Sequence, residues 1–143
     1  MSPLCVGTAS FSGSRVLRFV VQEHLSRTRH FDFRLERNGI FKSWAVPKGL
    51  PTWPGVKRLA VQVDDHPLEW GDFEGEIPVG EPGAGTVRIW DRGTYDLHEW
   101  LPDRISLTLY GNRLEGLYQL VAFRQAARGE WLIFKRSSQL RNA

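Results

Sequence analysis

The chain has 143 residues, a net charge of +3, a hydrophobic fraction of 41% and one cysteine, Cys5. This length suits one domain that buries roughly two-thirds of the surface its unfolded chain exposes. One cysteine excludes an intrachain disulfide and a thiolate zinc cluster, and no apolar run approaches the roughly 20 residues of a membrane-spanning helix. Residues 1–14 show no signal-peptide pattern. We therefore expect a soluble, cytoplasmic protein with a flexible arm over residues 1–14 and a single domain over residues 15–143.

The charges are segregated along the chain. Residues 15–58 hold ten Lys/Arg against three Asp/Glu, whereas residues 59–103 hold two against eleven. A basic block of this kind creates a positive field that attracts polyanions such as nucleic acid. The same segregation is equally compatible with charges that alternate around the folded surface, so charge alone does not identify the partner.

The chain order shows short strand-like runs separated by turns. The predicted strands are 16–23, 28–37, 40–46, 58–63, 85–90, 94–100, 105–110, 117–123 and 131–135. Asn38 and Gly39 supply the pair that a tight hairpin turn prefers, and a short helix or turn is expected near residues 76–82. This spacing predicts an all-β fold, a small closed or partly closed β-barrel of about eight strands with little helix.

Two long loops interrupt the strands. Residues 47–55 contain three prolines and two glycines, and residues 71–85 contain five glycines and two prolines. Long loops beside a barrel mouth commonly hold binding groups. Trp53, in the first loop, is compatible with stacking on a base or with covering the barrel end. The tryptophans inside apolar strands are expected to pack in the core; these are Trp44, Trp90, Trp100 and Trp131.

The most informative stretch is the run HFDFRL at residues 30–35. Successive side chains of a β-strand point to opposite faces, so His30, Asp32 and Arg34 share one face. The apolar side chains between them fill the core from the other face. An imidazole with a carboxylate is half of a divalent-metal site, and a guanidinium beside it receives phosphate oxygens. The pattern indicates phosphate-ester chemistry, although any amphipathic strand shows the same alternation.

His24 lies six residues before His30, close enough to complete a set of two imidazoles and one carboxylate. Three ligands leave coordination positions open, as in catalytic metal sites. Two other classes remain open. An iron(II) oxygenase would combine His30 and Asp32 with His66 or His98, and a non-catalytic nucleic-acid-binding barrel would use its histidines structurally. We expect His98, between Leu97 and Glu99, at the surface.

Several longer blocks of sequence are distinctive. They are FVVQEH (19–24), HFDFRLE (30–36), SWAVPKG (43–49), KRLAV (57–61), DDHPL (64–68), FEG (73–75), GAGTV (83–87) and WDRG (90–93). Over roughly residues 19–136 the chain resembles the 3′-phosphoesterase domain of bacterial DNA ligase D. The resemblance implies a small β-barrel enzyme of end-joining DNA repair. Such an enzyme removes a 3′-terminal ribonucleoside as a phosphodiesterase and then the 3′-phosphate as a phosphomonoesterase, leaving a 3′-hydroxyl.

The resemblance also assigns residues and partners. It implies Mn²⁺, with other divalent metals such as Co²⁺ as alternatives, held by His24, His30 and Asp32. Phosphate contacts would come from Arg34 and His66, and further activity residues would be Lys48, Arg58 and Asp64. Trp70 stands where the family commonly has Tyr, which puts a phosphate contact there in doubt. We expect a monomer that acts on a nucleic-acid primer-template, with the end-joining ligase and polymerase as separate chains.

The residues themselves leave some of these roles open. Arg34 would neutralise non-bridging oxygens, and a protonated His66 would stabilise the same charge or protonate the leaving oxygen. His66 is also compatible with a histidine hydrogen-bonded to backbone in the core. Lys48 and Arg58 are compatible with phosphate contacts or with solvated loop charges.

Overall fold

A computed structural model describes residues 16–123 and 129–137, and the expected arm at residues 1–14 lies outside this part. The described elements are β1 (Leu17–Leu25), β2 (Arg29–Arg37), β3 (Ile40–Val46), β4 (Lys57–Pro67), the 3₁₀ helix η2 (Leu68–Asp72), β5 (Gly75–Ile77), β6 (Gly85–Leu101), β7 (Arg104–Tyr110), β8 (Glu115–Ala122) and β9 (Glu130–Lys135). Within this part, no helix is long and apolar enough to cross a membrane.

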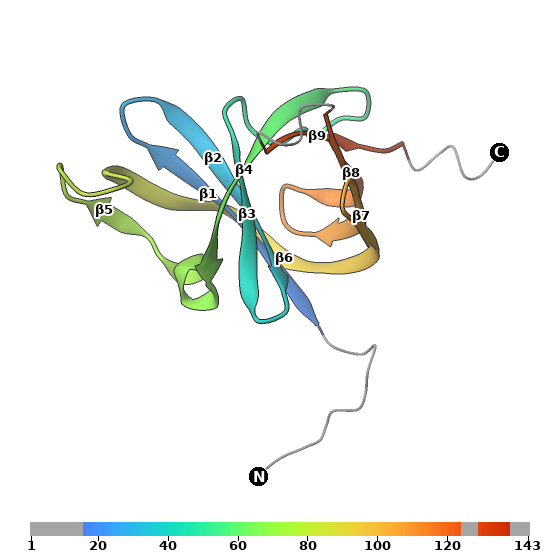
Figure 1. Ribbon diagram of the computed structural model, residues 1–143, viewed down its shortest axis with the longest axis horizontal. Coiled ribbons are helices and arrows are strands. Elements are labelled where there is room, and N and C mark those ends of the chain that lie inside the picture. Colours follow the sequence, from blue (N-terminus) through green and yellow to red (C-terminus); the bar gives the residue numbers. More distant parts are fainter. Residues whose placement is uncertain (1–15, 124–128, 138–143) are drawn as a thin grey trace, which may run out of the picture.

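Eight antiparallel strands close into a barrel. Their order is β1-β2-β3-β4-β9-β8-β7-β6, and β6 pairs back with β1. The short strand β5 is extra and pairs with the start of β6 (Figure 1). The predicted all-β barrel of about eight strands is therefore confirmed. The β2–β3 hairpin turns at Asn38 and Gly39, whose φ angles of 54° and 85° are the left-handed values that such a turn requires.

Two details differ from the expectation. The predicted strands 85–90 and 94–100 form the single strand β6. Gly93 lies between them but forms no turn. A glycine is needed there because the neighbouring backbone passes very close, and a Cβ would lie 2.0 Å from the Tyr110 carbonyl oxygen. The short helix or turn expected at residues 76–82 includes a turn at residues 79–80, whereas the helical turn of this region is η2, just before it.

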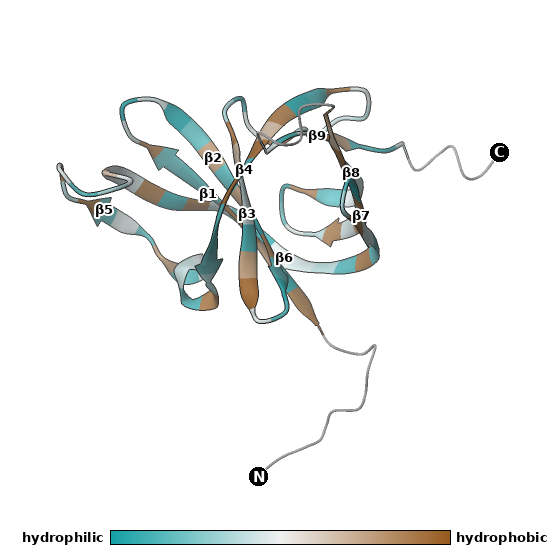
Figure 2. Cartoon of the chain, in the orientation of Figure 1, coloured by the Kyte–Doolittle hydropathy of each residue, from teal (hydrophilic) through white to brown (hydrophobic). Residues whose placement is uncertain are grey.

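The barrel interior is the hydrophobic core. Figure 2 shows apolar and polar segments succeeding one another along the strands, in keeping with strand alternation. The buried aromatic side chains of this core are Phe19, Phe31, Phe33, Trp44, Tyr95, Tyr118 and Trp131, with Trp90 and Trp100 packed against it. The core positions predicted for the four strand tryptophans are confirmed.

The outer face of β1 and β2 is covered as well. The segment that runs from η2 through β5 to the start of β6 folds over it, and Gln22 holds this segment in place. Its buried amide nitrogen donates hydrogen bonds to the carbonyl oxygens of Trp70 (2.9 Å) and Phe73 (3.0 Å). The second glycine-rich loop therefore covers the outer wall of the barrel. We call this covering segment, from η2 to the start of β6, the roof, and a cavity lies between it and the outer wall.

Candidate metal and phosphate site

The antiparallel register of β1 and β2 gathers the polar residues. His24 pairs with His30, and Gln22 pairs with Asp32. Paired residues of antiparallel strands project to the same face of a sheet. Because Phe31 and Phe33 point into the core, these polar side chains point outward, under the roof. The shared face predicted for His30, Asp32 and Arg34 follows from this arrangement.

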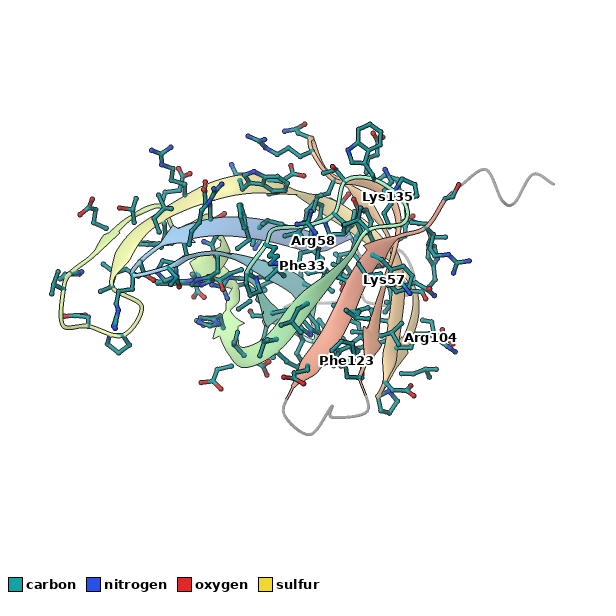
Figure 3. All side chains as sticks on the ribbon, turned by 90° about the horizontal axis from the view of Figure 1, so that it is seen from above. Phe33, Lys57, Arg58, Arg104, Phe123 and Lys135 are labelled. Atoms are coloured by element: carbon teal, nitrogen blue, oxygen red, sulfur yellow. The ribbon has the colours of Figure 1, made fainter. Side chains whose placement is uncertain are left out.

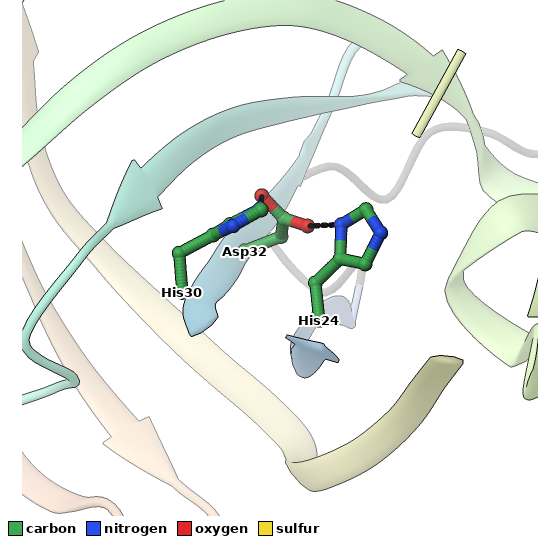
Figure 4. A group of neighbouring side chains, drawn as sticks. All are labelled: His24, His30 and Asp32. Atoms are coloured by element: carbon green, nitrogen blue, oxygen red, sulfur yellow. Dashed lines mark ion pairs between the residues drawn. The ribbon is translucent and has the colours of Figure 1, made fainter. Parts of the chain in front are cut away.

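His24, His30 and Asp32 form a compact cluster. One ligand atom from each lies within 4.8 Å of the other two. The carboxylate of Asp32 lies 3.6 Å from Nδ1 of His24 and 3.3 Å from Nε2 of His30. Figure 4 shows the three side chains facing one another. Two imidazole nitrogens and a carboxylate oxygen suit a divalent transition metal.

The backbone orients one of these rings. Nε2 of His24 lies 2.7 Å from the carbonyl oxygen of Gly83 and donates to it, so Nδ1 is the ring nitrogen that faces Asp32. A metal-binding histidine typically has its second nitrogen held in this way. Gly83 has a φ of +77°, and a Cβ there would lie 3.6 Å from Cε1 of His24. The glycine-rich roof therefore contributes directly to the geometry of the cluster, and the residues present fit a divalent cation.

The charges around Asp32 favour its ionised form. Burial alone would raise the pKa of this carboxyl group. The hydrogen bond from His30 and the positive charges of Arg34, His30 and His24 outweigh burial, so the pKa of Asp32 lies below its usual value. A carboxylate that stays ionised is the form that binds a metal ion.

Arg34 is buried and held on several sides. Its Nε donates to Oε1 of Gln22 at 2.6 Å, its Nη1 donates to Oγ of Ser43 at 2.8 Å, and its Nη2 lies 3.6 Å from Asp32. Burial lowers the pKa of this guanidinium, and the Asp32 carboxylate offsets part of the effect. A guanidinium fixed in this way is preorganised for the oxygens of a phosphate.

A β-bulge brings His66 to the same face. Phe41 pairs with His66 and Ser43 pairs with Val63, so β4 has one more residue than β3 over this interval. Bulges re-aim side chains in this way. Nδ1 of His66 lies 3.1 Å from Nη1 of Arg34 and 2.9 Å from the carbonyl oxygen of Asp64. Nε2 has no hydrogen-bond partner among the described residues, and His66 lines the cavity. Burial, followed by the charge of Arg34, lowers the pKa of His66.

These groups line one end of a cavity of about 630 Å³. Apart from Gly83, the rest of the lining is apolar and comprises Val63, Trp70, Ile77, Pro82 and Val87. The cavity therefore combines polar side chains that suit a metal and a phosphate with an apolar wall that suits a sugar or base.

Three of the predicted activity residues lie outside this cavity lining. Arg58 donates through Nη1 to the carbonyl oxygens of Lys48 and Gly49, the latter at 3.2 Å, so it fixes the loop after β3. The side chain of Lys48 is exposed. Asp64 contributes its backbone carbonyl to His66, and its side chain is exposed.

Sequence reasoning missed three contributors, namely Gln22, Ser43 and Gly83. The signal for Gln22 was its place two residues before His24 in one strand, because residues i and i+2 share a face. Ser43 and Gly83 carry no comparable signal, since their contacts depend on strand pairing and on the path of the roof.

His98 belongs to another surface. It is exposed, as predicted, and its Nε2 lies 2.7 Å from Oγ1 of Thr108 on the outer face of β6 and β7. The metal-binding group found among the described residues contains His24 and excludes His98.

The chain was compared with known proteins. A family model described as the DNA ligase D 3′-phosphoesterase domain matches residues 22–122. The multifunctional non-homologous end joining DNA repair protein LigD of Mycobacterium tuberculosis (strain CDC 1551 / Oshkosh) is 51% identical over 107 residues, which cover 72% of this chain and 14% of the relative.

Two further relatives, both multifunctional non-homologous end joining proteins LigD, extend this likeness. That of Pseudomonas aeruginosa is 47% identical over 126 residues, covering 84% of this chain and 15% of the relative. That of Mycolicibacterium smegmatis is 41% identical over 133 residues, covering 85% of this chain and 17% of the relative. The chain thus spans about one-sixth or less of the length of these relatives. Because the family match covers well over half of the chain, the chain belongs to the DNA ligase D 3′-phosphoesterase domain family.

Proposed function

We propose that this domain is a metal-dependent phosphoesterase that processes 3′ ends of nucleic acid in DNA repair by end joining. It removes a 3′-terminal ribonucleoside as a phosphodiesterase and a 3′-phosphate as a phosphomonoesterase, leaving a 3′-hydroxyl. One observation carries the proposal: His24, His30 and Asp32 share a cavity with a buried guanidinium, that of Arg34. Membership of the family supports the same chemistry.

Each group has a distinct role in this proposal. His24, His30 and Asp32 hold Mn²⁺ or a similar divalent ion such as Co²⁺, which supplies Lewis-acid stabilisation of the phosphoryl oxygens. Arg34 binds the non-bridging oxygens and offsets the charge that develops in the transition state. His66 presents Nε2 to the phosphate or to the leaving oxygen.

The residues outside the cavity lining are assigned supporting roles. Arg58 positions the backbone of Lys48, and Lys48 reaches the nucleic-acid strand from the loop after β3. Asp64 orients His66 through its carbonyl group. The apolar wall receives the terminal nucleoside.

The matched LigD proteins are about six to seven times longer than the segments they share with this chain. We propose that the domain acts as a monomer on a primer-template, in the cytoplasm with the chromosomal DNA.

An iron(II) oxygenase remains chemically compatible with two imidazoles and a carboxylate. The membership of the metal-binding group favours the phosphoesterase. The oxygenase set of His30 and Asp32 with His66 or His98 leaves His24 unused, whereas His24 belongs to the observed group, and the guanidinium of Arg34, 3.6 Å from Asp32, suits an anionic ester.

The test uses a primer-template whose primer ends in one ribonucleotide. The protein is incubated with it and Mn²⁺, with and without chelator, and the products are sized. We expect a primer shortened by one nucleoside that bears first a 3′-phosphate and then a 3′-hydroxyl.

Loss of a charge-assisted contact of about 1.5–3 kcal/mol predicts at least roughly tenfold slower turnover in Arg34→Ala. Arg34→Lys should restore only part of the rate, because an ammonium group is a point charge and cannot form the two parallel hydrogen bonds of a guanidinium. Turnover that needs dioxygen, or none in any metal, contradicts the proposal.

A further inference from the structure

The loop between β3 and β4 presents an indole to solvent. Trp53 is 73% exposed, whereas Trp44 and Trp131 are buried in the core. A large aromatic side chain that remains in water is available for stacking on a binding partner. Neither the metal cluster nor the cavity uses Trp53.

The loop that carries Trp53 is firmly anchored. Leu50 is buried in the core, and the carbonyl oxygen of Pro51 accepts a buried hydrogen bond from the hydroxyl of Tyr118 at 2.8 Å. Pro54 forms a bridge to Lys135, at the end of β9. The indole is therefore held out on a rigid base, which lowers the entropy cost of binding a partner.

Three lysines border this loop, and we call them the lysine rim: Lys48, Lys57 and Lys135. Lys57 begins β4 with its ammonium 5.4 Å from the centre of the Phe134 ring, and Figure 3 shows Lys57 and Lys135 at the same end of the barrel. Within the part of the chain that the structure describes, no rim lysine has a carboxylate within 4.0 Å, whereas Lys42 lies 3.1 Å from Asp65. Residues 47–58 contain no Asp or Glu.

The loop leaves the sheet beside the metal cluster. Val46, the last residue of β3, pairs with Phe31, which lies between His30 and Asp32 in the chain. Gly49 packs on the same ring, since a Cβ there would lie 3.4 Å from Cε1 of Phe31. The loop that carries Trp53 therefore begins next to the strand that carries His30 and Asp32.

We propose that Trp53 and the lysine rim form a second nucleic-acid contact, which holds an unpaired nucleotide of the substrate. Its base stacks on the indole and its flanking phosphates lie beside the ammonium groups. An exposed indole and lysines that lack carboxylate partners among the described residues, with no Asp or Glu in residues 47–58, suit an exposed base and a phosphate backbone better than a protein surface. This inference rests on the proposed function for the nature of the substrate, and it adds a preference for ends with an unpaired nucleotide.

The test measures binding without turnover. Fluorescence anisotropy in metal-free buffer compares two labelled DNAs with 3′-hydroxyl ends, a blunt duplex and the same duplex with a single-stranded template overhang. Stacking of one base predicts that Trp53→Ala weakens overhang binding by about fivefold or more and leaves blunt binding unchanged. Trp53→Phe should retain part of the affinity. The matched control is Tyr110→Ala, which removes an exposed aromatic whose hydroxyl bonds to Asp96.

Several results overturn the inference. They are unchanged overhang binding by Trp53→Ala, an equal loss on both DNAs, or the same loss in Tyr110→Ala. Concentration-dependent self-association that Trp53→Ala abolishes, with DNA binding intact, would assign the surface to a second copy of the chain and also overturn it. Equal melting temperatures of the variants verify that each remains folded.

The lysine rim is tested by salt dependence. Lys57→Gln should reduce the slope of log K against log salt by about 0.7 for overhang DNA, because one phosphate contact is lost. Lys42→Gln, which removes a lysine already paired with Asp65, should leave the slope unchanged. Equal slopes for wild type and Lys57→Gln overturn the role of the rim. Turnover of the wild-type protein is measured separately. If the protein binds DNA through Trp53 but has no phosphoesterase activity, only the proposed function is refuted. If it is active but its binding does not depend on Trp53, only the second contact is refuted.

Discussion

Gln22 accepts a hydrogen bond from Arg34, with 2.6 Å between Oε1 and Nε, and both side chains are almost fully buried. The amide nitrogen of the same Gln22 donates to the carbonyl oxygens of Trp70 and Phe73. A carboxamide is suited to this position, because it accepts on one atom and donates twice on the other. One side chain therefore orients the guanidinium of Arg34 and holds the segment that covers the cavity.

Gln22→Glu should destabilise the fold and reduce turnover. The carboxylate loses both donors and faces two carbonyl oxygens, each costing about 1–3 kcal/mol when buried without a partner. Urea unfolding should show the loss. The matched control is Gln119→Glu, because Gln119 donates to the hydroxyl of Ser106, which rotates to donate instead. An unchanged urea midpoint in Gln22→Glu would show that the amide does not hold the roof.

Metal binding should stabilise the folded protein. Mn²⁺ at one hundred times its dissociation constant adds about 2.7 kcal/mol to the free energy of unfolding. Asp32→Ala should abolish both this shift and turnover while leaving the fold intact, because the core face of β2 is untouched. Asp65→Ala removes an exposed carboxylate that pairs with Lys42 and serves as the control. A full Mn²⁺ shift in Asp32→Ala would refute the ligand assignment.

Strand alternation made much of the site predictable. The side-chain period of a β-strand is two, so the sequence alone places His30, Asp32 and Arg34 on one face. The antiparallel hairpin then sets His24 opposite His30, in agreement with the proximity expected from their spacing of six residues. The barrel itself was predictable from strand spacing and turn residues.

Long-range features of the site were not predictable. His66 reaches the cavity because β4 carries one extra residue, and no local pattern at Asp64 or Asp65 marks a bulge. The glycine-rich loop was expected beside a barrel mouth, but it covers the outer wall of the barrel. Its path depends on the contacts of Gln22 and on the approach of Gly83 to His24, which sequence spacing does not encode.

Anion binding should raise the pKa of His66. Burial and Arg34 hold this pKa below its usual value, and a bound dianion favours the charged imidazolium. By linkage, sulfate affinity should be higher when His66 is protonated and should fall as pH rises through the bound-state pKa. NMR titration of the His66 ring in metal-free protein, with and without sulfate, measures both effects. His66→Asn should remove this part of the pH dependence. An unchanged pKa under saturating sulfate would place the anion elsewhere.

Asp91 should matter for stability and not for metal binding. Its carboxylate is buried and accepts hydrogen bonds from the backbone N–H groups of Arg92 and of residues 112–114, at 2.7–2.9 Å. Asp91→Asn replaces one accepting oxygen by a donor, which should cost about 2–4 kcal/mol in thermal unfolding. Asp96→Asn is the control, since among the residues that the structure describes the exposed Asp96 accepts a hydrogen bond from Tyr110 alone, and an amide oxygen still accepts it. Loss of the Mn²⁺ shift in a folded Asp91→Asn protein would contradict this separation.

Trp70 lies in a stack of three rings. Its indole is 4.6 Å from the ring of Phe73, at 10°, and 6.0 Å from that of His66, at 29°. The indole therefore supports His66 from one side, whatever contact it makes with a phosphate. A tyrosine, the residue that the family commonly has here, would keep a ring in this stack and add a hydroxyl donor.

Trp70→Tyr should raise the monoesterase rate modestly and leave the diesterase rate nearly unchanged. One neutral hydrogen bond is worth about 0.5–1.5 kcal/mol, or roughly two- to twelvefold in rate, and the monoester presents the more negatively charged phosphate. Trp70→Ala is the matched comparison: it removes the stack against His66 and should slow both steps. Separate assays of a 3′-ribonucleotide primer and a 3′-phosphate primer measure the two rates. If Trp70→Tyr destroys both activities, the indole is needed for packing, and its hydrogen-bonding capacity has no bearing on phosphate recognition.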